Sequence, residues 1–434
     1  MKKSIASIFV LGLCFCVHGQ SIDKIITTNE VSRIEKVLSA DDMQGRRTFT
    51  PGIDKASAFI ESEFKKAGLK PFMSATNFRQ EFAMTESKAT SSKIIIDDKE
   101  IDNKQVVTFS YQPQVSLTEK SDVTVVKINK GDNLGKKFNE YYNSSKSYLV
   151  LVDPSFNNVL PNIQHIERIS ANPGNNTILF VFGVSQASTF SIELKNVISK
   201  KSLNNVVGVL PGKSKPDEYV IFSGHYDHLG VGSPEEGQPH PANDSIYNGA
   251  NDDAAGSTAV IMLANYFKKL NNNERTIIFT TFVAEELGGF GAKYFSKQLP
   301  ADKVIAMFNL EMIGTESKWG KNSAYITGFE KSNFGEILQK NLEKTNFKFY
   351  PDPYPEQQLF YRSDNATLAK LGVPAHTIST SKMDNEPNYH TADDEFETLD
   401  IPNMTEIIKA IALSSATIIS GKDTPTRVDS TKLR

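Results

Sequence analysis

The sequence of 434 residues is poor in cysteine, in long apolar runs and in excess charge of either sign. Its two cysteines, Cys14 and Cys16, both lie in an apolar stretch near the N-terminus. If that stretch is removed, the mature protein has no thiol, which excludes disulfides and a cysteine nucleophile. The formal net charge is −3, so composition gives no reason to expect nucleic acid or an anionic membrane as a partner.

The N-terminus has the pattern of a secretory signal peptide. Two lysines precede an apolar run from Ile5 to Val17, and small residues lead up to Gly19. The run is too short to span a bilayer, and no later stretch is long and apolar enough to do so. We therefore expect residues 1–19 to be cleaved and the protein to be secreted or periplasmic, with a retained N-terminal anchor as the alternative.

The rest of the sequence divides into four segments that differ in composition and hydrophobic pattern. Residues 20–86 contain helical patterns, and residues 87–204 contain short β-type runs that predict an inserted, mostly β domain. In residues 205–420 strands alternate with helices, which predicts an α/β fold with a mainly parallel central sheet flanked by helices. Residues 421–434 are polar and are expected to form a disordered tail. The predicted helices are 29–40, 53–67, 134–142, 256–269 and 403–419, and the predicted strands of the main domain are 206–210, 219–223, 276–283, 304–312, 324–327 and 373–379.

Acidic and imidazole side chains gather where the strands of the main domain give way to loops. Because the carboxyl ends of parallel strands meet at one edge of a sheet, ligands and metals collect there. Imidazole and carboxylate groups are zinc ligands, and catalytic sites keep one position open. A single such group is usually just solvated, but several at successive strand ends predict a metal-dependent hydrolase. The groups are His225, Asp227, Asp252, Asp253, Glu285, Glu286, Glu311 and His390.

The adjacent Glu285 and Glu286 suit two different tasks. Neighbouring residues that leave an extended segment point in different directions. One carboxylate can therefore bind metal while the other faces the substrate as a general base, and metal-assisted hydrolysis needs both.

The sequence lacks the motifs of other common enzyme classes. It has no Walker loop, no Gly-x-Gly-x-x-Gly at a strand–helix turn and no Gly-x-Ser-x-Gly elbow.

Five motifs resemble, in order, those of the co-catalytic two-zinc aminopeptidase family, which includes bacterial leucyl aminopeptidases, aminopeptidase Y and glutamate carboxypeptidase II. The resemblance covers about residues 38–420, and the inserted region is similar to a protease-associated domain. The motifs are His225-Tyr-Asp227-His228-Leu-Gly, Gly249-Ala-Asn-Asp252-Asp253-Ala-Ala-Gly, Glu285-Glu286-Leu-Gly, Asn309-Leu-Glu311-Met-Ile-Gly and Asn388-Tyr-His390-Thr-Ala-Asp393-Asp.

The resemblance implies a zinc exopeptidase fold with two zinc ions per chain. One ion would take His225, Asp252 and Glu311, and the other would take Asp252, Glu286 and His390. In this sequence Glu311 stands where an Asp is usual in the family. The carboxylate chemistry is kept, but the side chain is one methylene longer, so the spacing or affinity of the metals is expected to differ.

The same resemblance implies an aminopeptidase that hydrolyses N-terminal residues of peptides through a water bridging the two zinc ions. Glu285 would take the proton of this water as general base, and Asp227 would hold the first imidazole in orientation. A stretch at Ser363 resembles a Ser-Asp-His sequence of the family but lacks the His. Tyr361 is a candidate oxyanion donor, with a plain pocket wall as the alternative.

Three other readings stay open. A glutaminyl cyclase-like enzyme would use one zinc, and a carboxypeptidase would need a cation such as Arg46, Arg47 or Arg362 for the substrate carboxylate. A non-catalytic binding protein would be expected to have lost ligands, whereas this sequence retains them.

The remaining histidines of the globular part receive structural interpretations. We expect His165 and His240 to lie at the surface and His376 to be a satisfied interior histidine. His228 is expected to cap or hydrogen-bond within its own loop, with metal ligation as the alternative.

Overall fold

The computed structural model describes residues 22–73, 75–164, 166, 168–232 and 244–433, in two compact units. The first unit comprises the residues up to Glu81 and those from Asn204 onward, and the second is Phe82–Leu203. The predicted signal peptide, His165 and His240 lie outside the described residues. Among the residues that are described, no helix has the length and apolar character needed to cross a membrane.

The first unit is built on a mixed sheet whose four central strands are parallel. They lie in the order β18-β15-β11-β14. Strands β16 and β17 extend one side with the opposite direction, and the end of β10 pairs antiparallel with β14. The predicted fold class, a mainly parallel sheet flanked by helices, is therefore confirmed. The strands of this unit are β1 (Lys70–Pro71), the end of β10 (Phe190–Leu210), β11 (Lys215–His225), β12 (Gly230–Val231), β13 (Ile246–Tyr247), β14 (Arg275–Phe282), β15 (Val304–Leu310), β16 (Ser323–Ile326), β17 (Lys348–Pro351) and β18 (Ala375–Ser379).

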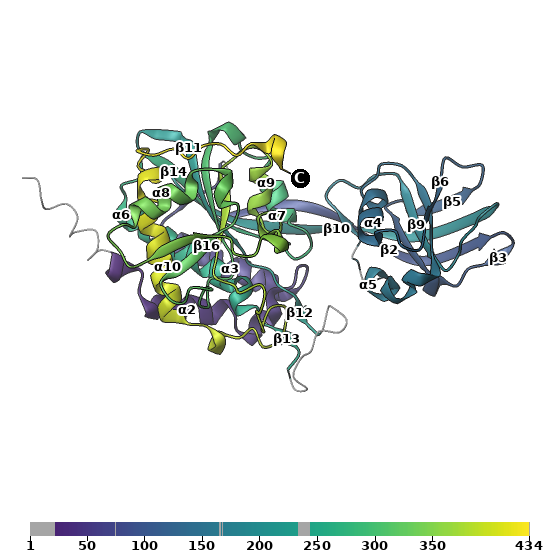
Figure 1. Ribbon diagram of the computed structural model, residues 1–434, viewed down its shortest axis with the longest axis horizontal. Coiled ribbons are helices and arrows are strands. Elements are labelled where there is room, and N and C mark those ends of the chain that lie inside the picture. The colour runs from purple at the N-terminus through teal and green to yellow at the C-terminus, as the bar shows by residue number, and fades with distance from the viewer. Residues whose placement is uncertain (1–21, 74, 165, 167, 233–243, 434) are drawn as a thin grey trace, which may run out of the picture. The chain divides into compact units, whose positions relative to one another are not determined.

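Helices cover both faces of this sheet (Figure 1). Successive side chains of a strand point to opposite faces, so Ile221 and Phe222 of β11 enter different cores. Phe222 stacks on Phe267 of α6 at 5.6 Å, whereas Ile221 packs in a cluster with Phe295 of α7 and Leu368 of α9. The result is a three-layered α/β/α unit. Its helices are α2 (Thr28–Leu38), α3 (Pro51–Ala67), α6 (Ala255–Leu270), α7 (Phe290–Phe295), α8 (Phe334–Asn341), α9 (Asn365–Ala369), α10 (Ile401–Ser414) and α11 (Ala416–Ile419).

The second unit contains a four-stranded sheet in the order β4-β9-β7-β6. Strands β6, β7 and β9 are parallel, and β4 pairs antiparallel with β9. The sequence predicts the insertion at 87–204, close to these bounds, and it predicts α4 at the residues where the helix occurs. The elements are β2 (Arg79–Ile96), β3 (Lys99–Glu100), β4 (Val106–Ser110), β5 (Gln114–Thr118), β6 (Thr124–Ile128), α4 (Leu134–Tyr142), β7 (Tyr148–Val152), α5 (Leu160–Gln164), β8 (Ile169–Ser170), β9 (Thr177–Phe182) and the start of β10.

The C-terminal tail differs from its prediction. Residues 421–433 are described and packed against the first unit, so the expectation of a disordered tail is wrong. Arg427 donates to the carbonyl of Val304 at 2.7 Å, and Val428 is buried. Arg275, itself buried, donates to the carbonyl of Asp423. These contacts with folded strands hold a segment whose polar composition alone predicts disorder.

Candidate metal centre

The candidate site lies at the carboxyl ends of the parallel strands, where the strand order reverses. The chain runs from β11 to its neighbour β14 and then to β15 on the other side of β11. His225 is the last residue of β11, Glu311 directly follows β15, and Glu285 comes shortly after β14. Such a reversal opens a crevice beyond the strand ends, where α/β proteins bind their ligands.

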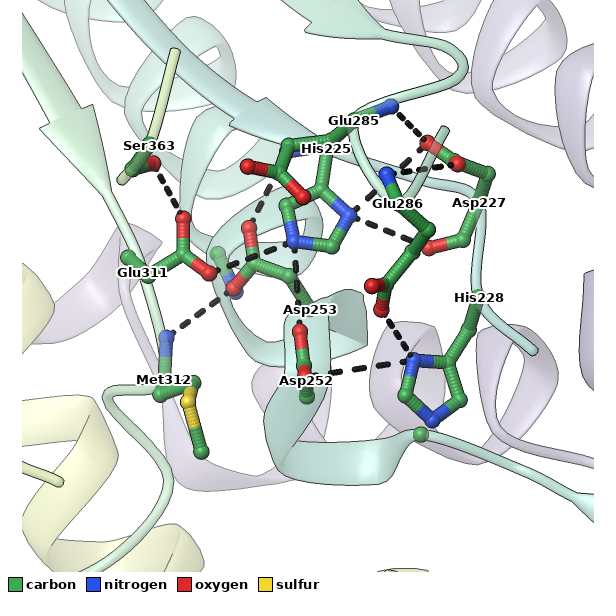
Figure 2. A network of polar contacts seen from close by, with 12 residues as sticks. His225, Asp227, His228, Asp252, Asp253, Glu285, Glu286, Glu311, Met312 and Ser363 are labelled. Atoms are coloured by element: carbon green, nitrogen blue, oxygen red, sulfur yellow. Dashed lines mark hydrogen bonds and ion pairs between the residues drawn. The ribbon is translucent and has the colours of Figure 1, made fainter. Parts of the chain in front are cut away.

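Asp252 occupies the middle of the site, in the turn that leads into α6. Its Oδ1 lies 3.2 Å from Nε2 of His225, and its Oδ2 lies 3.3 Å from Nε2 of His390. Oε1 of Glu311 lies 3.2 Å from the same His225 nitrogen, and Figure 2 marks this contact with a dashed line. Oε2 of Glu286 lies 3.4 Å from the His390 nitrogen. The structure thus brings the five predicted ligands together as two triads that share Asp252.

The spacing within each triad suits a zinc ion. Zinc binds nitrogen and oxygen at about 2.0–2.2 Å in tetrahedral sites, so two ligands of one ion lie about 3.3 Å apart. The observed separations are 3.2–3.4 Å. Mixed imidazole and carboxylate donors are also the ligand types that zinc accepts. Both the geometry and the donor chemistry of the triads therefore fit divalent ions.

The electrostatics of the triads favour positive charge between the carboxylates. Burial opposes protonation of His225, but Glu311 and Asp252 outweigh it and hold the pKa of His225 well above its ordinary value. Burial is likewise outweighed at His390, where Asp252 and Glu286 raise the pKa to about 11. Despite burial, the hydrogen bonds from His225 and His390 hold the pKa of Asp252 well below its usual range. A divalent ion would supply the same positive charge that protons on the imidazoles supply.

Asp253 also lies near the first triad, but its oxygens have other partners. One oxygen of Asp253 belongs to a group with His225 and Glu311 whose ligand atoms lie within 4.8 Å of one another. However, Oδ2 accepts the backbone N–H of His225 at 3.0 Å, and Oδ1 accepts the N–H groups of Gly256 and Met312 at 3.0 and 3.1 Å. Asp253 therefore holds the backbone on either side of the first triad. The peptide bond between Asp252 and Asp253 is cis.

Asp227 fixes the backbone of the Glu285–Glu286 pair. Its Oδ1 accepts the N–H of Glu285 at 3.1 Å, and its Oδ2 accepts the N–H of Glu286 at 3.3 Å. Toward His225, the backbone carbonyl of Asp227 lies 3.0 Å from Nδ1, whereas the carboxylate lies 3.8 Å away. The imidazole is thus oriented mainly by the carbonyl of Asp227, and the carboxylate organises the neighbouring loop.

Backbone strain accompanies the site residues. Ala284, Met312 and His390 have φ values of 59°, 51° and 57°, a left-handed region that residues with a side chain adopt rarely. Two of these positions are held by hydrogen bonds. Asp227 accepts the N–H of Glu285, which follows Ala284, and Asp253 accepts the N–H of Met312. Strained positions of this kind cluster at functional sites.

Two residues that support the centre receive no role from the sequence. Asp394 accepts the backbone N–H groups of Asn251 and Asp252 at 2.9 and 3.0 Å. Ser363 donates to Oε2 of Glu311 at 2.5 Å. Both lie in stretches that the motif comparison singles out, but only the folded chain shows what they contact.

An open cleft lies over the two triads. It is lined by Glu285, whose pKa is raised well above its usual range by burial and by the nearby Glu311 and Asp364. Apolar side chains share the lining with the acids. The lining residues are Asp252, Glu285, Glu286, Glu311, Met312, Tyr325, Thr327, Leu359, Arg362, Ser363, Thr377, Ser379, Met383, Tyr389 and His390.

Three further predictions concern single side chains. His376 is fully buried, with Nδ1 bonded to the carbonyl of Thr327 and Nε2 to the hydroxyl of Ser332, so the satisfied interior histidine is confirmed. The expectation that His228 bonds within its own loop is wrong, because its Nδ1 contacts Glu286 at 2.8 Å. Tyr361 is not among the residues that line the cleft and instead packs against an apolar cluster of the first unit.

The α/β/α unit carries two histidine–carboxylate triads at the point where its strand order reverses. This arrangement is that of an α/β protein with a candidate metal centre. Residues 205–415, which carry all of these candidate ligands, match the sequence profile described as Peptidase family M28.

Similar proteins agree with this match. The chain is 27% identical over 235 residues to a protein of Trichophyton verrucosum (strain HKI 0517) described as "Probable leucine aminopeptidase", and the match spans 52% of this chain and 60% of that protein. It is 32% identical over 122 residues to a "Probable zinc metalloprotease" of Pyrenophora teres f. teres (strain 0-1), covering 28% of this chain and 24% of that protein. The matches thus span no more than about 60% of the length of these relatives.

Solved structures share the fold. An aminopeptidase from Aneurinibacillus sp. strain AM-1 has a TM-score of 0.57 at 16% identity and covers 92% of this chain and 96% of its own. A zinc aminopeptidase from Bacillus subtilis has a TM-score of 0.54 at 15% identity, with coverage of 92% and 97%. At such low identity, the likeness establishes a common architecture.

Proposed function

We propose that this chain is a secreted aminopeptidase that binds two zinc ions and removes N-terminal residues from peptides. The observation that carries the proposal is the position of Asp252, whose two oxygens each face a different imidazole. One carboxylate shared by two His–Glu pairs is what a bridged pair of ions requires. The descriptions of the relatives as leucine aminopeptidase and zinc metalloprotease support the same chemistry. The predicted signal peptide supports secretion.

In this proposal His225, Asp252 and Glu311 hold one ion, and Asp252, Glu286 and His390 hold the other. When bound, the ions would supply Lewis-acid polarisation of the scissile carbonyl and of water. The positions of Asp227, Asp253 and Asp394 support a preformed centre, because these carboxylates hold the backbone that carries the ligands.

Glu285 is proposed as the general base. It lines the cleft beside both triads, and its carboxylate accepts no hydrogen bond among the contacts of the described residues. It would take a proton from the attacking water and return it to the leaving amine.

The lining of the cleft favours a free N-terminus. Of the four carboxylates that line the cleft, Asp252, Glu286 and Glu311 would hold the two ions, which leaves Glu285 to attract the α-ammonium group of a peptide. Apolar side chains of the same wall, including Leu359, suit an apolar first residue.

A carboxypeptidase is the second candidate. Such an enzyme requires a cation for the substrate carboxylate, and three arginines are candidates for this role. Arg46 is fully buried and donates to backbone carbonyls, and Arg47 donates to the carbonyl of Leu229. Arg362, in contrast, lines the cleft. A one-zinc glutaminyl cyclase and a non-catalytic protein receive less support, since both triads retain every donor.

The test combines metal content with turnover of free and N-acetylated peptides. We expect two zinc ions per chain and hydrolysis of free N-termini alone. Glu285→Gln should keep both ions and lose about 10²–10⁴-fold in turnover. Full turnover by this variant at full metal content would remove Glu285 as the base, and cleavage of N-acetylated peptides from the other end would replace the aminopeptidase by the carboxypeptidase.

A further inference from the structure

His228 is buried beside the second triad, and one of its ring nitrogens lies within 4.8 Å of carboxylate oxygens of Asp252 and Glu286, so it is either a metal ligand or a partner of one. Its Nδ1 lies 2.8 Å from Oε1 of Glu286, and Figure 2 shows its ring nitrogen facing that carboxylate from the loop after β11. The other oxygen of Glu286, Oε2, lies 3.4 Å from Nε2 of His390. The two oxygens of Glu286 therefore have different neighbours, one imidazole each.

The two distances separate a hydrogen bond from a shared ion. Two ligands of one zinc ion lie about 3.3 Å apart, which matches the contact with His390 but not the shorter contact with His228. A distance of 2.8 Å is that of a direct hydrogen bond to a carboxylate. The Nδ1 atom also lies 4.0 Å from Oδ2 of Asp252, farther than the His390 nitrogen does.

Packing fixes the His228 ring in this orientation. Gly249, with a φ of 55°, lies so close that a Cβ there would be 2.4 Å from Cδ2 of the ring. The backbone N–H of His228 donates to the carbonyl of Arg46 at 3.3 Å. Among the described residues Nε2 has no hydrogen-bond partner, so the ring makes its polar contact through Nδ1.

We propose that His228 is a positioning residue for the second zinc ion. Its Nδ1–H donates to Oε1 of Glu286 and turns Oε2 toward the position between His390 and Asp252. Without this bond the carboxylate rotates freely, and the ligand oxygen is no longer fixed. The inference rests on the proposed two-zinc function and deepens it. Comparable outer partners of metal ligands are worth about 10–100-fold in metal affinity.

The experiment measures zinc affinity on the full chain by competition with a chelator, for the wild type, His228→Ala and His228→Asn. The amide nitrogen of Asn lies where Nδ1 of His lies, so His228→Asn keeps the donor but removes the rest of the ring. We expect His228→Ala to keep one ion tightly and to bind the other about 10–100-fold more weakly. We expect His228→Asn to restore most of that affinity.

His376→Asn is the matched control, because His376 is equally buried but its hydrogen bonds go to Thr327 and Ser332 and to no triad residue. It should lower thermal stability and leave both zinc affinities unchanged. Unchanged affinities in His228→Ala would overturn the positioning role. So would a His228→Asn variant as weak as His228→Ala, which would instead assign the ring as a ligand. A wild-type chain with fewer than two ions would refute the proposed function itself, which is a different result.

Discussion

The guanidinium of Arg46 donates from Nε to the carbonyl oxygen of Tyr226 at 2.9 Å. Arg46 is fully buried, and its other nitrogens donate to the carbonyls of Leu38, Asn248 and Gly249. Tyr226 follows a proposed zinc ligand, and Gly249 begins the turn that carries another. One buried side chain therefore ties the N-terminal segment to two loops of the centre.

We expect Arg46→Gln to lower both stability and metal content. Several buried carbonyls would lose their donor, and each costs about 1–3 kcal/mol when left unpaired. The free energy of unfolding should fall by about 3 kcal/mol or more, measured by urea denaturation. Arg79→Gln is the control, because Arg79 forms a partly exposed ion pair with Glu61 that is worth about 1 kcal/mol or less. Equal losses in the two variants would contradict this account.

The sequence marks Glu311 and His225 as candidates because both stand where an apolar strand ends, whereas the full ligand set comes from the resemblance of the motifs to the family. Glu311 directly follows β15, and His225 ends β11, so local patterns place both at the same edge of the sheet. The helix over Leu134–Tyr142 is likewise predicted at its observed bounds, because its polar N-cap, Asn133, and its own side-chain pattern define it locally.

Contacts between distant segments could not be predicted in this way. Arg46 and Tyr226 are 180 positions apart, and nothing in the sequence of either segment indicates that they are in contact. The bond from His228 to Glu286 joins two loops whose relation exists only after β11 and β14 pair. Helix α8 has no counterpart among the predicted helices, since it is short and its burial depends on neighbours such as α10.

Arg362 allows a test of whether the cleft binds the C-terminal carboxylate of a dipeptide substrate. Its guanidinium donates to Gln357 and lines the cleft. A dipeptide with a free carboxylate would gain from this cation, whereas the same dipeptide as its C-terminal amide would not. We expect Arg362→Gln to lower kcat/KM for the free acid about tenfold, which is the scale of one charge-assisted hydrogen bond. The same variant should leave kcat/KM for the amide nearly unchanged. Equal effects on both substrates would show that Arg362 does not contact the carboxylate.

Removal of metal should destabilise the first unit. The carboxylates of Asp252, Glu286 and Glu311 converge, and a bound cation stabilises the folded state in proportion to its affinity, by about 2.7 kcal/mol at a hundredfold excess over Kd. A chelator should therefore lower the melting temperature by several degrees, and added zinc should restore it. Asp252→Asn is the control, because it removes the shared carboxylate and should make the melting temperature insensitive to the chelator. A wild-type chain whose melting temperature ignores the chelator would argue against a resident ion.

Glu35 predicts a pH dependence of stability outside the metal centre. It lies fully buried in α2, and burial raises its pKa from 4.5 to about 8, although Thr258 and Arg46 act in the opposite direction. The folded state therefore binds this proton more tightly than the unfolded state does. The stability that this residue contributes is complete below pH 4.5 and is lost as the pH rises toward about 8.

Glu35→Gln should remove this dependence, because a neutral amide still accepts the hydrogen bond that Thr258 donates at 2.7 Å. The variant should match the wild type at low pH and exceed it at high pH by a few kcal/mol, since each pKa unit corresponds to about 1.4 kcal/mol. Urea unfolding across that pH range measures the difference. Glu343→Gln, at an exposed position, should give a curve parallel to the wild type. If the Glu35→Gln curve is parallel as well, the buried carboxyl does not hold its proton in the folded chain.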